Sequence, residues 1–225
     1  MRPFLIYLVL MFGLNSYSQN DSITVRFVPT FNGELLVLDK NYPLHNYDSA
    51  RIRQLKFYVS NFSFITQDST KTPHQNMGYL IDLEDKLQLK LPLNSQFAFD
   101  SIGFNLGIDS LTNSGGALSG DLDPINGMYW AWQSGYINFK LEGTSPACYA
   151  RKSKFQFHIG GYLSPFNSIQ EVTLGVHDST LIKIEIPIDQ LLTRVVVRSD
   201  HTIMSPNKQA VWFAEKIGKA IKLKR

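Results

Sequence analysis

The chain has 225 residues, of which 44% are hydrophobic, 12% aromatic and 18% charged, with a formal net charge of +3 and one cysteine. A low charge with many aromatic residues excludes an intrinsically disordered chain, and a single cysteine excludes a scaffold held by internal disulfides. Lys and Arg do not form a face interleaved with aromatic residues, so we expect no nucleic-acid partner.

The first 19 residues are typical of a secretory signal peptide. Arg2 supplies a positive charge, an apolar run of 11 residues extends from Phe4 to Leu14, and the expected cleavage point lies near Ser18 or Gln19. Because a bilayer-spanning helix needs about 20 apolar residues, this run is too short to be an anchor. We therefore expect a periplasmic or secreted protein with no membrane span, whose residues 20–225 form one domain.

Alternating apolar and polar residues predict many short strands in this domain. Ile23–Val28 alternates, and the Asn32-Gly33 turn indicates a hairpin with Glu34–Leu38. The apolar series of residues 52–64 changes phase at Ser60-Asn61, which predicts a bulge or a strand break. Further strands are expected at Gly78–Leu83, Leu87–Leu91, Phe97–Leu106, Tyr136–Glu142, Lys154–Tyr162, Ile169–Val176, Leu181–Ile186 and Val195–Arg198.

Short strands separated by turn-rich loops predict an all-β fold, an antiparallel β-sandwich or an open barrel. The C-terminal segment differs, because Ser205 is a candidate N-cap, Pro206 suits a first helical turn, and apolar residues recur from Ala210 to Ile221. We expect one amphipathic helix there, packed against the sheet and closing one of its open ends.

Two histidines have neighbours that suit a metal site. In FQFHIGG, Phe155 and Phe157 share one face of the predicted strand, and His158 lies on the other. His201 precedes the predicted helix, and Met204 adds a soft thioether three residues later. Imidazole and thioether are ligands that copper accepts, Met being suited to Cu(I), although packing under the helix is the simpler role for Met204.

The segment GMYWAWQSGY holds two tryptophans two residues apart. If it is a strand, Trp130 and Trp132 lie on one face, as an aromatic core cluster, a cation–π platform or a surface that stacks on a sugar ring. A secreted interaction or carbohydrate-binding module is therefore the alternative to a metal-binding protein. The sequence has no nucleotide-binding loop, nucleophile elbow, HExxH or CxxC, and we expect no enzyme.

These segments resemble the MbnP-like copper-binding domain of exported bacterial proteins associated with methanobactin. The resemblance rests on residues 121–143 around GMYWAWQSGY, on LKFYVSN, on FQFHIGG and on HTIMSP, and covers nearly the whole mature chain. It implies a β-sandwich-like domain that binds one copper ion through histidines, near a tryptophan that some members carry oxidised to kynurenine by a partner dihaem enzyme of the peroxidase type.

The resemblance carries His158 and His201 onto the family's histidines, and Trp130 and Trp132 onto its tryptophan segment. A branch with a kynurenine copper site has Trp-x-His where this chain has Trp-x-Trp. Kynurenine, Met204 or water would complete the copper coordination. Calcium is an alternative ion that Asp109, Asp121 and Asp123 could hold, but the loop lacks a full calcium motif, and turn-forming aspartates are the preferred interpretation.

Overall fold

The computed structural model describes residues 22–44, 48–74, 78–92, 99–176, 180–192 and 200–224. The expected signal peptide, the expected strand Val195–Arg198 and the start of the expected strand Phe97–Leu106 lie outside these residues. Within the described residues no helix is long and apolar enough to cross a membrane.

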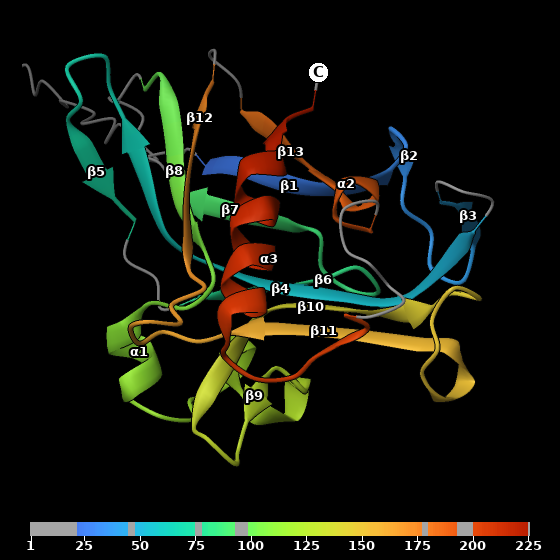
Figure 1. Ribbon diagram of the computed structural model, residues 1–225. Helices are drawn as coiled ribbons and strands as arrows, with labels where there is room; N and C mark the ends of the chain where they lie inside the picture. Colours follow the sequence, from blue (N-terminus) through green and yellow to red (C-terminus); the bar gives the residue numbers. More distant parts are fainter. Residues whose placement is uncertain are drawn as a thin grey trace, which may run out of the picture.

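Two curled sheets form the body of the molecule (Figure 1). The smaller sheet has the order β15 (Lys222–Leu223), β13 (Leu181–Pro187), β1 (Ser22–Phe31) and β2 (Glu34–Leu35), with β7 (Gln88–Pro92) also paired to β1. The larger sheet has the order β12 (Gln170–Gly175), β8 (Ser101–Leu106), β4 (Ser49–Ile65), β10 (Gly135–Thr144), β11 (Lys154–Gly160) and β14 (Thr202–Ile203). The short strands β3 (Asn41–Pro43), β5 (Lys71–Pro73) and β6 (Tyr79–Asp82) pair with β4, and β9 (Tyr129–Trp130) pairs with β10.

The inner faces of the two sheets share one hydrophobic core. Phe27 of β1 meets Phe57 of β4 and Phe104 of β8 edge-on, with ring centroids 5.4 and 6.0 Å apart. The predicted all-β sandwich-type fold is therefore confirmed. The pairs β1–β13 and β11–β14 are parallel, a detail that the expectation of an antiparallel sandwich missed, because each pair joins segments far apart in the chain.

The phase change predicted within β4 is confirmed. Asn61 has a positive φ of 51°, and the pairing of β4 with β8 shifts register between Ser60 and Ser63. An extra residue in one strand bends it and increases its twist. The bulge lets one strand of 17 residues pair with β10 along its first half and with β8 along its second.

The C-terminal helix α3 (Lys208–Ala220) lies across the open side between the sheets, as expected (Figure 1). Its Phe213 packs on Phe139 and Phe157 of the larger sheet. The predicted N-cap was wrong: Asn207, not Ser205, accepts a hydrogen bond from the backbone N–H of Ala210 at 2.8 Å. Asn caps as well as Ser does, and this cap lies two residues closer to the apolar stripe that the helix buries.

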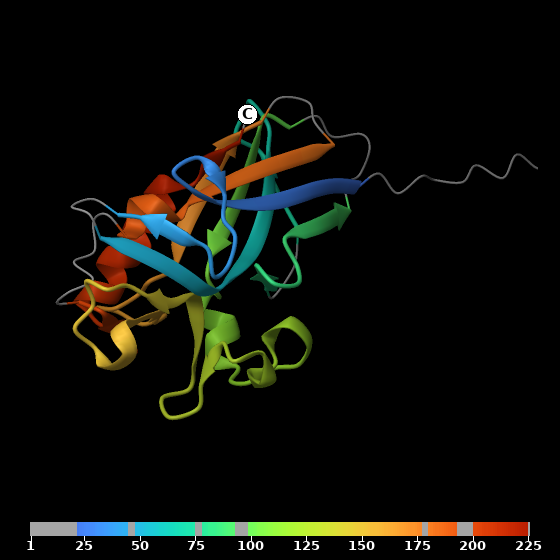
Figure 2. The same cartoon turned by 90° about the vertical axis from the view of Figure 1, so that its right-hand side faces the viewer.

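Residues 108–136, which we call the lobe, fold over the outer face of the larger sheet at the end away from β1 (Figure 2). The lobe contains α1 (Ser110–Ser114), the 3₁₀ helices η2 (Gly120–Leu122) and η3 (Pro124–Asn126), and β9. A second apolar cluster lies beneath it: Tyr58, Leu80, Ile108, Leu122, Met128, Trp130, Tyr136 and Ile137. The remaining helical elements are η4 (Arg151–Ser153) and α2 (Ile188–Leu192).

Candidate functional site

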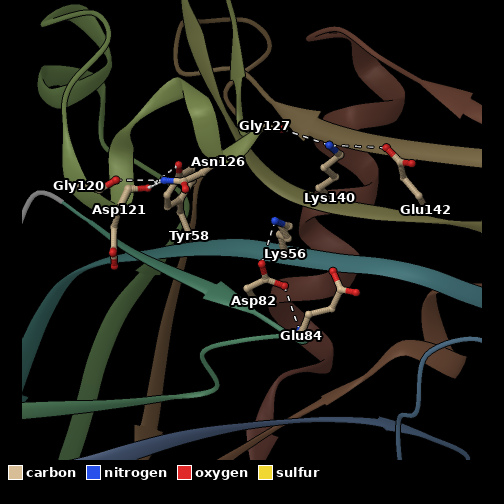
Figure 3. A network of polar contacts seen from close by, with 10 residues as sticks. All are labelled: Lys56, Tyr58, Asp82, Glu84, Gly120, Asp121, Asn126, Gly127, Lys140 and Glu142. Atoms are coloured by element: carbon tan, nitrogen blue, oxygen red, sulfur yellow. Dashed lines mark hydrogen bonds and ion pairs between the residues drawn. The ribbon is translucent and has the colours of Figure 1, made fainter.

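The outer face of the larger sheet carries a polar row beside the lobe. Lys140 of β10 is the register partner of Lys56 on β4 and of His158 on β11, and Lys56 is in turn paired with Asp82 on β6. Figure 3 shows the two lysines adjacent, with Asp82 2.8 Å from Lys56 and Glu142 3.7 Å from Lys140. The Nζ of Lys140 also donates to the carbonyl oxygen of Gly127 at 3.1 Å, which ties the row to the lobe.

His158 stands at the end of this row. Its Nε2 lies 2.6 Å from Oε1 of Glu142, and its side chain is 8% exposed. The hydrogen bond from His158 holds the pKa of Glu142 below its usual range, and the Lys140 charge adds to the effect against the opposing desolvation. An ionised Glu142 accepts a hydrogen from Nε2. In the neutral imidazole the lone pair then belongs to Nδ1.

Trp130 lies on the same face of β11 as His158. A Cβ built on Gly160 would lie 2.7 Å from Cζ3 of Trp130, so the indole rests directly on that glycine. Residues two apart on a strand share a face, and His158 is therefore about 7 Å from Gly160 along the strand. The indole of Trp130 thus lies on the same face as His158, two residues farther along β11.

The predicted pairing of the two tryptophans on one face of a strand was wrong. Strand β9 ends at Trp130, and Trp132 lies in the turn that leads to β10. Trp130 is 5% exposed and Trp132 is 66% exposed, although their ring centroids are only 6.0 Å apart. The short strand gives way to a turn because residues 131–134 must reverse the chain between β9 and β10.

A small pocket of about 230 Å³ opens beside Trp130. Aromatic and apolar side chains and glycines form most of its wall: Trp130, Gly135, Gly161, Tyr162, Leu163, Phe166 and Pro206. Trp130 Nε1 is buried and has no hydrogen-bond partner among the described residues. An unpaired buried N–H is costly, so this donor is available to an acceptor that enters from outside the chain.

The structure separates the two predicted histidines along the edge of the sheet. In the parallel β11–β14 pair, Thr202 faces Gln156 and Ile203 faces Phe157, and the carbonyl oxygen of His201 accepts from the Gln156 N–H at 2.8 Å. By this register His201 is opposite the core residue Phe155, about 10 Å along the strand from His158 and at a register position of the opposite face of the sheet.

Met204 follows Ile203 directly and leaves the sheet at the level of His158. Its side chain is 38% exposed, so it is not a core residue packed under the helix.

The three aspartates considered for calcium each hold the lobe together. Asp109 accepts from the Thr112 N–H at the start of α1, and Asp123 accepts from the Ile125 N–H at the start of η3. Asp121 binds the Lys86 Nζ at 2.6 Å and the Leu80 N–H at 3.0 Å. All three carboxylates therefore already accept hydrogen bonds, two of them as helix caps and Asp121 as a link between the lobe and the sheet.

The side chains of this face that can bind a metal are the imidazole of His158 and the carboxylate of Glu142. Met204, which follows Ile203, is at the same level of the sheet edge, and imidazole and thioether groups suit copper better than calcium. Metal-bound histidines usually donate their second N–H to a carboxylate, which is the arrangement of His158 and Glu142. The described residues contain no group of three His, Cys, Asp or Glu side chains placed to hold a metal, so this donor set depends on Met204 or on a ligand from outside.

Sequence reasoning missed Glu142 and Lys140 as members of this site. Glu142 alone, ahead of a glycine, has no distinctive pattern. The signal that existed was the alternation in NFKLEG, which places Lys140 and Glu142 on the polar face of β10. Their meeting with His158 depends on the register of β10 against β11, which the sequence does not state.

The fold and this face define a class of protein: a two-sheet β protein with a tryptophan-bearing lobe beside a histidine–carboxylate pair. The chain belongs to the MbnP family, whose model matches residues 20–206. It is also similar to the solved structure of MbnP from Methylosinus trichosporium, with a TM-score of 0.63 and 14% sequence identity over 85% of this chain and 86% of that one. At this identity the likeness establishes the fold. No curated protein matches the chain.

Proposed function

We propose that the protein is exported and binds one copper ion, in copper acquisition, storage or delivery, as a binding protein rather than an enzyme. The observation that carries the proposal is the bonded pair His158–Glu142 on the outer face of the larger sheet, with Trp130 two residues farther along the same face of β11. Membership of the MbnP family, which the sequence analysis associates with exported copper-handling proteins, supports it.

The proposed metal donor is Nδ1 of His158, with Met204 as a second ligand from the neighbouring edge strand. Glu142 orients the imidazole and keeps Nδ1 free of a proton. Nitrogen and thioether donors favour Cu(I). His201 is at a register position of the opposite face, so we leave it out of this ligand set.

Titration with Cu(I) against a chromophoric competitor tests this site. We expect His158→Ala to weaken binding at least 100-fold because a ligand is lost, and Glu142→Gln to weaken it about 10- to 100-fold because the imidazole loses its orienting carboxylate. Met204→Leu should weaken binding while leaving the fold intact, since the side chain is half-exposed.

His74→Ala is the matched control, because His74 bonds to Tyr79 at the far end of β4 and lies outside the proposed site. His201→Ala is measured separately, and a loss equal to that of His158→Ala would add His201 to the ligand set. Unchanged affinity in His158→Ala would contradict the proposal.

The tryptophan that we assign to this site is Trp130, because it rests on Gly160 beside His158. If a partner dihaem enzyme of the peroxidase type oxidises it to kynurenine, one carbon is lost and one oxygen gained, which raises the mass of the protein by about 4 Da. Peptide mapping of protein isolated from its native host tests this, with Trp132 and Trp212 as internal controls.

Carbohydrate binding is the second candidate, and the exposure of Trp132 favours it. A ring that is 66% exposed beside a pocket of about 230 Å³ offers a stacking surface for one sugar ring. Glycan-dependent quenching of tryptophan fluorescence that is lost in Trp132→Ala would support this function. Copper binding should be unaffected by the same substitution.

A further inference from the structure

Three cationic side chains stand next to one another across the smaller sheet, far from the lobe. Arg26 on β1 is the register partner of Lys183 on β13, and the backbone N–H of Lys224 donates to the carbonyl oxygen of Lys183 at 2.9 Å. Paired residues on neighbouring strands project from the same face, so the three charges are adjacent. Like charges directly opposite one another destabilise a sheet, which makes this row costly without an anion.

One carboxylate orders the neighbouring lysines but does not neutralise the row. Glu185 is 9% exposed, accepts a hydrogen bond from Thr30 Oγ1 at 2.7 Å, and lies 3.8 Å from Lys222 and 3.9 Å from Lys224. Among the described residues, no carboxylate lies within 4.0 Å of Arg26 or Lys183. The cluster therefore keeps a net positive charge on a rigid support.

The charged row lies where two hollows meet. The larger hollow, of about 950 Å³, is lined by Lys183, Lys222, Lys224 and the carboxylate Glu185, together with apolar residues that include Leu181 and Leu223. The smaller, of about 320 Å³, is lined by Arg26, Lys183 and Lys224 and by apolar residues that include Val28, Leu35 and Leu87. Leu35 is 60% exposed and Leu181 is 41% exposed, so apolar surface adjoins the cations on both sides.

We propose that this groove binds an anionic amphiphile, a single molecule with a phosphate or carboxylate head and an alkyl chain. The head pairs with Lys183 and Lys224, the two cations common to both hollows, and the chain lies in the smaller hollow against Leu35 and Leu87. The positive charge of the lysines favours an anionic head, and burial of methylene groups in the smaller hollow favours an alkyl chain. Each buried methylene strengthens binding about fourfold, so affinity rises with chain length until the hollow is full.

Calorimetric titration of the purified protein with decyl phosphate, below the concentration at which it forms micelles, tests the site. We expect decyl phosphate to bind, octyl phosphate to bind about 16-fold more weakly at about fourfold per methylene, and inorganic phosphate and decanol to bind more weakly still. Sodium decanoate in place of decyl phosphate shows which head the cations prefer, and binding of either supports the site.

The double variant Lys183→Gln/Lys224→Gln should weaken decyl phosphate binding at least tenfold. Lys71→Gln/Lys208→Gln removes the same charge from exposed positions on β5 and α3, and should leave the affinity unchanged. Leu35→Gln should reduce the gain from octyl to decyl, because it alters the chain subsite and leaves the cations in place.

Equal losses in both lysine double variants, or inorganic phosphate binding as tightly as decyl phosphate, would overturn the proposal. Sedimentation with vesicles of anionic phospholipid distinguishes binding of a single dissolved amphiphile from binding to a lipid bilayer. Binding to vesicles without binding of dissolved decyl phosphate or decanoate would also overturn it, since the surface would then recognise a bilayer rather than one molecule.

Discussion

Tyr58 shows how one buried hydroxyl ties the lobe to the sheet. The residue is fully buried on β4, and its hydroxyl donates to the carbonyl oxygen of Asp121 in η2 at 3.0 Å. Burial, and to a smaller extent Tyr136 and Asp121, raise the pKa of Tyr58 well above its ordinary value of 10. The fold therefore favours the neutral phenol. The stability that Tyr58 contributes through this preference is fully present below pH 10 and is lost as the pH rises further.

We predict that Tyr58→Phe lowers the free energy of unfolding by about 1 kcal/mol at neutral pH, because a buried hydrogen bond is lost. Above pH 10 the variant should lose stability less steeply than the parent, since one raised phenol pKa has been removed. Urea unfolding between pH 7 and 11 measures both effects. Parallel curves for the two proteins would contradict the assignment.

Gly160 allows Trp130 to approach the strand that carries His158. A Cβ at this position would lie 2.6 Å from the carbonyl oxygen of Tyr136 and 2.7 Å from the indole of Trp130. The carbonyl belongs to the backbone of β10 and has little freedom to move. We predict that Gly160→Ala costs about 1–3 kcal/mol of unfolding free energy and shifts the fluorescence of Trp130.

Gly175 provides the control for that substitution, because it too ends a strand and its nearest neighbour would be 3.9 Å from a new Cβ. Gly175→Ala should be neutral or slightly stabilising. Denaturant unfolding followed by tryptophan emission measures both variants. Equal stability of the Gly160→Ala and Gly175→Ala variants would show that close packing at position 160 does not disfavour a residue larger than glycine.

At the scale of elements, helix α3 depends on a cap that the sequence pattern did not single out. We predict that Asn207→Ala lowers the unfolding free energy by about 1 kcal/mol, because the Ala210 N–H loses its acceptor. Ser205→Ala should change it by less than about 0.5 kcal/mol. Thermal unfolding of the two variants ranks them, and a larger effect at Ser205 would restore the capping role first expected for it.

At the scale of the whole molecule, the two apolar clusters divide the protein into a body and a lobe. Met128 is fully buried in the lobe cluster and is absent from the main core. We predict that Met128→Ala costs about 2–5 kcal/mol locally. Hydrogen exchange should then show faster exchange in residues 108–136 than in β1 and β13, because the two cores open separately. A uniform loss of protection would show one cooperative unit.

The proposed copper site and the proposed amphiphile groove lie on different sheets. The His158–Glu142 pair lies on the larger sheet, and the basic groove lies on the smaller sheet. Each is built on paired strands, so neither requires the other to move. Copper binding and amphiphile binding are therefore expected to be independent.

Much of this architecture could be read from local pattern. Period-two alternation located strands such as β1, β10, β11 and β13 within a few residues, since each buries one face against the core. The phase change at Ser60-Asn61 located the bulge in β4 for the same reason. His158 was found because it lies on the polar face of the strand that the alternation in FQFHIGG predicts. Helix α3 was found because its apolar residues have helical spacing.

The sequence alone determined which segments are strands, which faces they bury and which residues have side chains able to bind a metal, because those properties depend on neighbours along the chain. Register and strand order decided the rest. They separated Trp130 from Trp132, joined His158 to Glu142, set His201 three residues away along the edge, and aligned Arg26 with Lys183. Such contacts depend on residues up to 157 positions apart, as for Arg26 and Lys183, and only packing of the complete chain fixes them.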